Sequence, residues 1–210
     1  MRRLFALAVF GFGLVVTAAF IAPPIASPPP TPHIHIVLSP SGNEARYRVR
    51  EQLVGIDFPS DAIGETQSLS GTLVLDADGH ILRDSSRFAI NLADLKSNKS
   101  TRDKYLRNHT LETEKFPTAL LSPVAFTGIT GPVPVVGTRA FQLLADFTVR
   151  GVTRPTTWNI SATFDHGDVT GTATTAFTFK EMGLEQPNVS VLLSVEDTIK
   201  LEYDFHVVAR

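Results

Sequence analysis

Few side chains in the sequence have the type and spacing that chemistry would need, and Glu51 is the most notable of them. In a strand predicted over residues 45–54, Glu51 shares the apolar face with Tyr47 and Val49. A carboxylate directed into a pocket could hold a polar head group or act as an acid with a shifted pKa. Carboxylates more often lie at strand ends and reach water, and we expect this of Glu51.

The six histidines do not form a convincing metal site. His33 and His35 alternate on the polar face of the first predicted strand, and no carboxylate lies beside them at ligand spacing. The other four fall in predicted turns or on polar faces: His80, His109, His166 and His206. The sequence also lacks the serine-nucleophile, zinc-protease and nucleotide-loop motifs. We therefore predict no catalytic residue, no metal site and no cofactor.

Composition narrows the class of protein. The 210 residues include no cysteine, which excludes disulfides, thiolate catalysis and cysteine-bound zinc. Hydrophobic residues make up 43%, enough for one domain with a sizeable core. The net charge of −2 gives no basic footprint for nucleic acid, so we predict no nucleic-acid partner.

The N-terminus has the pattern of an export signal. Arg2 and Arg3 precede an uninterrupted apolar run over residues 4–22, long enough for an apolar helix that spans a bilayer. Residues 1–22 are therefore either a cleaved signal peptide or a membrane anchor, and both alternatives stay open. Residues 23–32 hold six prolines and predict a stiff, extended linker. We expect an exported domain over residues 33–210, periplasmic or extracellular, tethered to the cytoplasmic membrane if the leader is not cleaved.

From His33 onward, polar and apolar residues alternate with the period of two that is typical of β-strands. The alternating segments are residues 33–36, 45–54, 69–75, 86–92, 141–150, 156–164, 169–180 and 199–207. Short connections, such as residues 151–155 and 165–168, favour an antiparallel meander. Because no long helix is available to cover the apolar faces, the sheet must close into a barrel or fold into a sandwich.

One segment interrupts this alternation. Residues 96–115 lose the alternation and predict a short helical excursion over residues 102–107, with Ser100 or Thr101 as its cap. A surface loop with one helical turn is almost as good an interpretation.

On the outer face of the last strand, acidic side chains could pair with basic ones of an early strand if the barrel closes there. These are Glu202 and Asp204, opposite Arg46, Arg48 or Arg50.

The domain resembles the YceI-like family over nearly all of residues 33–208. The resemblance rests on EARYRVRE at 44–51, FPSDAIG at 58–64, SGTL at 70–73, RDKYL at 102–106, EKFP at 114–117 and DFTVRGVTRP at 146–155. It implies an all-β, lipocalin-like barrel of eight antiparallel strands that takes an isoprenoid lipid, polyprenyl or quinone-type, into its lumen. The segment FTFKEMGL at 177–184 departs from the family's frequent RSDFG pattern, which puts polar contacts at that end in doubt. The family supplies no catalytic residue.

A lipid in the lumen would contact the inward faces of the strands. The lumen residues that we predict are Tyr47, Val49, Phe88, Ile90, Phe141, Leu143, Phe147, Trp158, Ile160, Phe164, Phe177, Phe179, Leu201, Tyr203 and Phe205. Small inward residues would leave volume for the ligand: Ala145, Ala162, Gly171 and Ala173. An eight-stranded barrel is also narrow enough for side chains to plug it, in which case these residues are plain core.

Two other functions compete with a lipid carrier. An exported enzyme could use the barrel as its pocket, with Glu51 and a neighbouring tyrosine as an acid–base pair. A protein-interaction module could use a packed barrel as a scaffold, with recognition by the loops around residues 131–137 and 185–189. A homodimer is a further open alternative.

Overall fold

A computed structural model describes residues 32–210 of the chain. The predicted leader over residues 1–22, with its apolar helix, and the linker up to residue 31 lie outside the described residues. Within residues 32–210, no helix is long and apolar enough to cross a bilayer.

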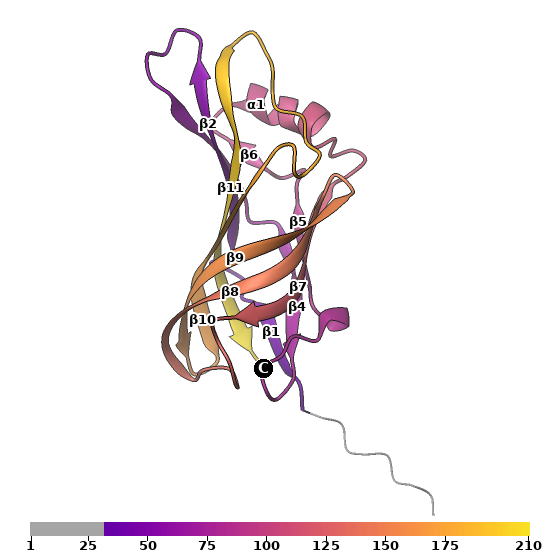
Figure 1. The fold of residues 1–210 in the computed structure, drawn as a ribbon, viewed down its shortest axis with the longest axis vertical. Helices are drawn as coiled ribbons and strands as arrows, with labels where there is room; N and C mark the ends of the chain where they lie inside the picture. The colour runs from indigo at the N-terminus through magenta and orange to yellow at the C-terminus, as the bar shows by residue number, and fades with distance from the viewer. Residues whose placement is uncertain (1–31) are drawn as a thin grey trace, which may run out of the picture. The chain divides into compact units, whose positions relative to one another are not determined.

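Strands dominate the described part of the chain (Figure 1). They are β1 (Ile34–Leu38), β2 (Glu44–Leu53), β3 (Ser60–Thr66), β4 (Leu69–Leu75), β5 (Arg87–Asn91), β6 (Lys96–Ser97), β7 (Thr118–Thr127), β8 (Val136–Val149), β9 (Val152–Asp165), β10 (Asp168–Thr178) and β11 (Leu192–Ala209). Three short helical segments accompany them: η1 (Arg83–Ser85), α1 (Ser100–Tyr105) and η2 (Leu106–Thr110).

Eight of the strands form a closed ring in the order β1, β4, β5, β7, β8, β9, β10 and β11, and every neighbouring pair is antiparallel. The seam is β11, whose last residues pair with β1 and whose earlier residues pair with β2. From β2 the sheet continues through β3 to β6, beside α1 (Figure 1). The predicted eight-stranded, lipocalin-like antiparallel barrel with one short helix is confirmed.

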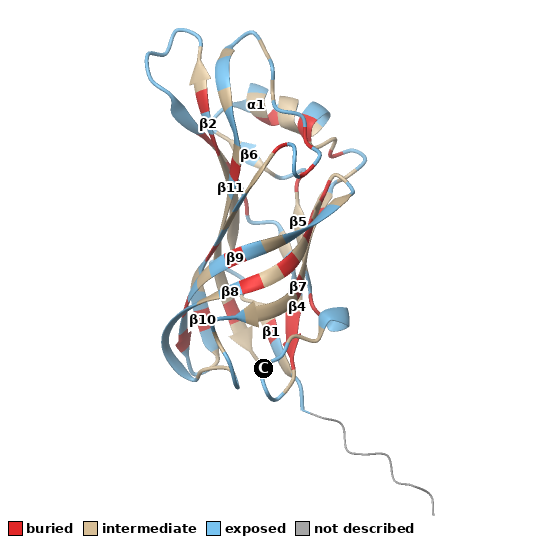
Figure 2. Ribbon diagram, in the orientation of Figure 1, coloured by how far each residue is buried: buried red, intermediate tan, exposed pale blue. Residues whose placement is uncertain are grey.

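Alternating side chains explain why these segments form a barrel wall. In β9, Trp158, Ala162 and Phe164 are buried, and the threonine, asparagine and serine residues between them are exposed. The same alternation runs along β10 and shows as alternating buried and exposed segments in Figure 2. Because successive strand residues point to opposite faces, one apolar residue in two is enough to build the interior.

The links that join β8, β9 and β10 are shorter than we predicted from the sequence. Arg150 and Gly151 alone connect β8 to β9, both with positive φ, as a two-residue hairpin turn requires. Our predicted connection over residues 151–155 was therefore wrong, because β9 begins at Val152 and carries Pro155 within its ladder to β8. Pro155 lies opposite Asp146 in a non-hydrogen-bonded pair of the ladder to β8, so its nitrogen faces the side of β10. Because β10 does not pair with this part of β9, the missing N–H breaks no ladder hydrogen bond.

The predicted charge pairs across the seam form on the outer face. Arg46 lies 2.6 Å from Asp204, and Arg48 lies 2.9 Å from Glu202. Arg50 pairs instead with Asp61 of β3, at 3.1 Å. The Arg48 guanidinium holds the pKa of the Glu202 carboxyl below its usual range. Partly exposed pairs of this kind contribute about 0–1 kcal/mol each, so their main effect is on strand register.

Candidate ligand-binding cavity

The barrel is hollow. A cavity of about 670 Å³ runs through its interior, and apolar side chains make up most of its lining. The buried core divides into two clusters around this space, and Ile81, Phe126, Ile160 and Phe205 contact both clusters. The interior is therefore one continuous apolar chamber, not a barrel plugged by its own side chains.

All fifteen side chains that we predicted for the lumen line this cavity. Several of their rings pack edge to face or at a tilt. The ring centroid of Phe147 lies 6.1 Å from that of Trp158 and 5.9 Å from that of Phe177. The indole N–H of Trp158 donates to Thr156 Oγ1 at 3.0 Å, so its polar group is satisfied within the wall. The periodicity thus located the wall of the cavity, and the contact of these residues with a ligand stays a prediction.

The small residues on the inward faces of the strands differ in whether they leave volume for a ligand in the cavity. Ala162 and Ala173 line the cavity, whereas Ala145 is buried in the wall. Gly171 does not leave volume, contrary to our expectation, because the ring of Phe205 on the neighbouring strand covers it. Two more strand glycines are covered in this way by the aromatic residue directly opposite: Gly64 by Tyr47 and Gly71 by Phe88. These rings lie along the wall, where they stiffen strands that glycine would otherwise loosen.

The residues that close the two ends of the cavity are not among those predicted from the alternation of the strands. At one end these are Leu92, Leu95, Leu106, Thr110, Leu111 and Leu184, which come from loops and from the helical segment. At the other end they are residues 78–80 and 129–134, which come from two turns. None of these segments has the period of two, so alternation could not assign their side chains to the inside.

The first end is covered by α1 and η2, the predicted helical excursion. The helix begins at Ser100, and Lys99 occupies its N-cap position. The prediction that Ser100 or Thr101 caps the helix was therefore wrong. Asp103 instead reaches back to Ser97 of β6 and accepts hydrogen bonds from its N–H at 2.9 Å and its hydroxyl at 2.6 Å. These bonds fasten the helix to the end of the sheet.

A buried ion pair makes a second connection between α1 and the barrel. Glu51 accepts a hydrogen bond from Arg102, and the two side chains are only 8% and 14% exposed. Our expectation that Glu51 lies at a strand end and reaches water was wrong, because Glu51 is buried and the Arg102 side chain of α1 pairs with it. Glu51 also does not line the cavity. The alternative of an exported enzyme placed Glu51 and a tyrosine in the barrel pocket as an acid–base pair, and the Glu51 carboxylate is not in that pocket.

Two buried hydroxyls at this end have no hydrogen-bond partner among the described residues, Tyr47 Oη and Thr110 Oγ1. Both residues line the cavity. The Ser97 hydroxyl lies close enough to lower the pKa of Tyr47, but the geometry between them does not make a hydrogen bond. Burial outweighs this effect and the opposing charge of Arg102, and raises the pKa of Tyr47 to about 12.

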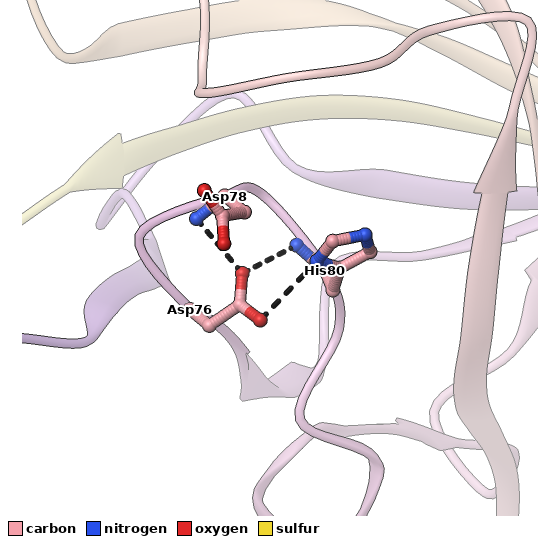
Figure 3. Close-up of side chains that lie close together, drawn as sticks. All are labelled: Asp76, Asp78 and His80. Atoms are coloured by element: carbon pink, nitrogen blue, oxygen red, sulfur yellow. Dashed lines mark hydrogen bonds and ion pairs between the residues drawn. The ribbon is translucent and has the colours of Figure 1, made fainter. Parts of the chain in front are cut away.

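The second end is closed by two turns that meet at a pair of glycines. A Cβ at Gly79 would collide with the carbonyl oxygen of Gly131, so the two backbones touch. Beside this contact, ligand atoms of Asp76, Asp78 and His80 lie within 4.8 Å of one another (Figure 3). The Asp76 carboxylate accepts hydrogen bonds from the backbone N–H groups of Asp78 and His80 at 3.0 and 2.8 Å, and these bonds lower the pKa of Asp76. The three side chains therefore lie close together because the backbone forms a tight turn.

Large apolar side chains are exposed beyond the helical end of the barrel. Val54, Ile56 and Phe58 belong to the hairpin between β2 and β3, and Val191 and Leu193 lie at the neighbouring start of β11. The interaction-scaffold alternative assumed a packed barrel, which the cavity contradicts. One of the two loops that it invoked, residues 131–137, contributes residues 131–134 to the cavity lining.

Comparison with known proteins agrees with this fold. Residues 37–207 match the family model of the YceI-like domain. A polyisoprenoid-binding domain from Saccharophagus degradans, implicated in plant cell wall breakdown, is similar with a TM-score of 0.65 and 12% identity, over 83% of this chain and 98% of that one. BcnA of Burkholderia cenocepacia is similar with a TM-score of 0.57 and 12% identity, over 80% and 96% of the two chains.

A YceI protein of Campylobacter jejuni is also similar, with a TM-score of 0.52 and 14% identity over 68% of this chain and 82% of that one. No curated protein matches the sequence. At such low identities, the three solved structures establish the fold alone.

Proposed function

This chain belongs to the YceI-like family, and we propose that its barrel binds the hydrocarbon chain of an isoprenoid lipid and carries it outside the cytoplasm. The observation that carries the proposal is the continuous apolar cavity. Its volume of about 670 Å³ lies within the range of roughly 300–1,000 Å³ that is typical of small-molecule sites. The related domain from Saccharophagus degradans is a polyisoprenoid-binding domain, which points to the same class of ligand.

The energetics of such binding are favourable. Burying one CH₂ group gains about 0.8 kcal/mol, so one isoprene unit offers a gross gain of roughly 3–4 kcal/mol. Micromolar binding requires about 8 kcal/mol net. After the costs of association and of ordering the chain, a lipid of a few isoprene units is long enough. The rings and small side chains of the lining suit a flat, branched chain of this kind.

The leader supports a location outside the cytoplasm. Positive charge before the apolar run over residues 4–22 is the orientation that exports the remainder of the chain. Binding is favoured over catalysis because Glu51 faces Arg102 and not the cavity.

The test is to purify the full chain from its own host and to identify bound lipid by native mass spectrometry and extraction. A prenyl-tailed lipid in near-stoichiometric amounts is the expected result. A protein free of lipid that also fails to bind added prenyl lipids would contradict the proposal.

A matched pair of variants on β10 sharpens this test. Ala173→Phe fills the cavity from an inward position, while Ala176→Phe adds the same ring on the exposed face. The first variant should lose bound lipid and the second should keep it, with both folded by circular dichroism. Equal lipid content in the two variants would mean that the ligand lies elsewhere.

A further inference from the structure

We propose that the exposed apolar side chains beyond the helical end of the barrel insert into the surface of an anionic lipid bilayer. This surface, the apolar tip, comprises Val54, Ile56 and Phe58 of the hairpin between β2 and β3, with Val191 and Leu193 at the start of β11. The inference goes beyond the proposed function, because it concerns the outside of the molecule and not the cavity.

The first observation is the exposure of the apolar tip. Its five side chains are between 51% and 79% exposed, with Phe58 the most exposed of them. The two segments lie side by side, since the N–H of Val54 donates to the carbonyl of Val191 at 3.0 Å. Single exposed apolar side chains are ordinary, whereas a group of large ones marks a surface that binds something.

The second observation is the shape of this surface. The ladder between β2 and β11 continues past the closed ring as far as the pair of Leu53 with Leu192, so the hairpin and the start of β11 project beyond the barrel (Figures 1 and 2). A stable interface between two proteins takes about 20–30 residues on each side, more than two short protruding turns provide. A bilayer has no such requirement, because it yields to a small protruding group of apolar side chains.

The third observation is the distribution of charge. In the turns themselves, residues 54–59 and 187–193, the only charged side chain is Asp57. From β2 the sheet continues through β3 to β6, beside α1, and the cations of this flank form no ion pair among residues 32–210. They are Lys96, Lys99, Lys104 and Arg107. Apolar side chains with cations beside them are typical of segments that lie in the interface of anionic membranes.

The charges also set the orientation of the docked barrel. On the opposite flank of the apolar tip, Glu196 and Asp197 of β11 are exposed, and anionic head groups would repel them. We therefore expect the barrel to lean with α1 toward the bilayer. Docking at this end leaves the turns at the other end of the cavity, residues 78–80 and 129–134, free to open.

The experiment places one fluorescent probe at either end of the full chain, which has no cysteine of its own. Ile56→Cys and Val136→Cys, at positions 51% and 52% exposed, are labelled with nitrobenzoxadiazole and mixed with excess vesicles that contain a spin-labelled lipid. The vesicles are phosphatidylcholine, alone or in equal mixture with phosphatidylglycerol. We expect a blue shift and quenching of the probe at position 56 and not at 136, with several-fold tighter binding to the anionic vesicles.

Variants of the chain labelled at position 56 separate the apolar and the charged contributions. Phe58→Ser with Leu193→Ser should weaken binding to both kinds of vesicle about tenfold or more, whereas the control Val135→Ser at the turn end should not. Lys99→Gln with Lys104→Gln should weaken binding to anionic vesicles about tenfold and leave neutral ones unchanged. Its control is Arg87→Gln with Arg139→Gln, two exposed cations away from the helical end.

Three outcomes would overturn the inference. The probe at position 56 stays unquenched, or both probes are quenched alike, in which case the apolar tip is not what enters the bilayer. A blue shift at position 56 that grows with protein concentration without vesicles would assign the apolar tip to a second copy of the chain. Since the vesicles contain no isoprenoid lipid, none of these results bears on the proposed function, and a barrel that binds no prenyl lipid would still dock.

Discussion

The two ends of the cavity are closed by different means. At the helical end, α1 is fastened by the buried pair of Glu51 and Arg102 and by the bonds of Asp103 to Ser97. At the other end, two turns meet through the backbones of Gly79 and Gly131, and Val135 and Val136 beyond them are exposed.

This difference indicates a division of roles. Charged, buried connections hold one end in a single arrangement, which suits the recognition of a ligand group. Surface turns that meet through backbone contacts open at a lower cost in free energy, which suits the passage of a long chain. We therefore expect the lipid to pass through the turn end.

The largest expected effect comes from breaking the helical end. Arg102→Ala leaves the Glu51 carboxylate buried and unpaired, and should lower the free energy of unfolding by about 3–5 kcal/mol in chemical denaturation. The control is Arg83→Ala, which removes an exposed pair with Asp146, where we expect less than about 1 kcal/mol. Similar losses in the two variants would refute a fixed helical end.

The turn end is tested by adding one methyl group. Gly79→Ala should push the two turns apart, lower the free energy of unfolding by about 1–2 kcal/mol and speed the release of lipid in a transfer assay several-fold. Gly55→Ala is the matched control, because Gly55 has a similar positive φ of +77° but no atom within 4 Å of the added Cβ. Unchanged release from the Gly79 variant would exclude this end as the route.

Alkaline pH probes the burial of Tyr47 at the helical end of the barrel. The pKa of Tyr47 is raised from 10 to about 12, so the folded protein keeps its proton in a range where the unfolded chain loses it. Stability should thus be unaffected by Tyr47 below pH 10 and should fall as the pH rises toward 12, by about 1 kcal/mol at pH 11. Denaturation of the parent and of Tyr47→Phe across this range measures the difference, which should be absent if Tyr47 is solvated.

The smallest effect belongs to the outer face, away from both ends. The pKa of Glu202 is lowered by Arg48, so the pair stabilises the fold above the ordinary carboxyl pKa and loses this effect as the pH falls through the lowered value. Glu202→Gln should cost about 0.5 kcal/mol at pH 7 and nothing near pH 3. A penalty that persists in acid would have a cause other than the charge pair.

The same contrast between wall and ends decides what the sequence could predict. Alternation along β9 and β10 assigned Trp158 and Phe177 to the interior, because a strand has only two faces and one of them must be buried. The ends could not be assigned in this way. Thr110 reaches the cavity through a π-turn, and Glu51 meets a partner 51 positions along the chain, and neither arrangement leaves a periodic trace.

The seam has a consequence for how the protein is made. Ile36 pairs with Ala209 and Leu38 with Val207, so the two ends of the domain close the ring upon each other. Contacts so distant along the chain form slowly and only after much conformational entropy has been lost. The closed cavity therefore requires the last strand, and a chain that ends before Val207 would lack the pairs between β1 and β11 that close the ring.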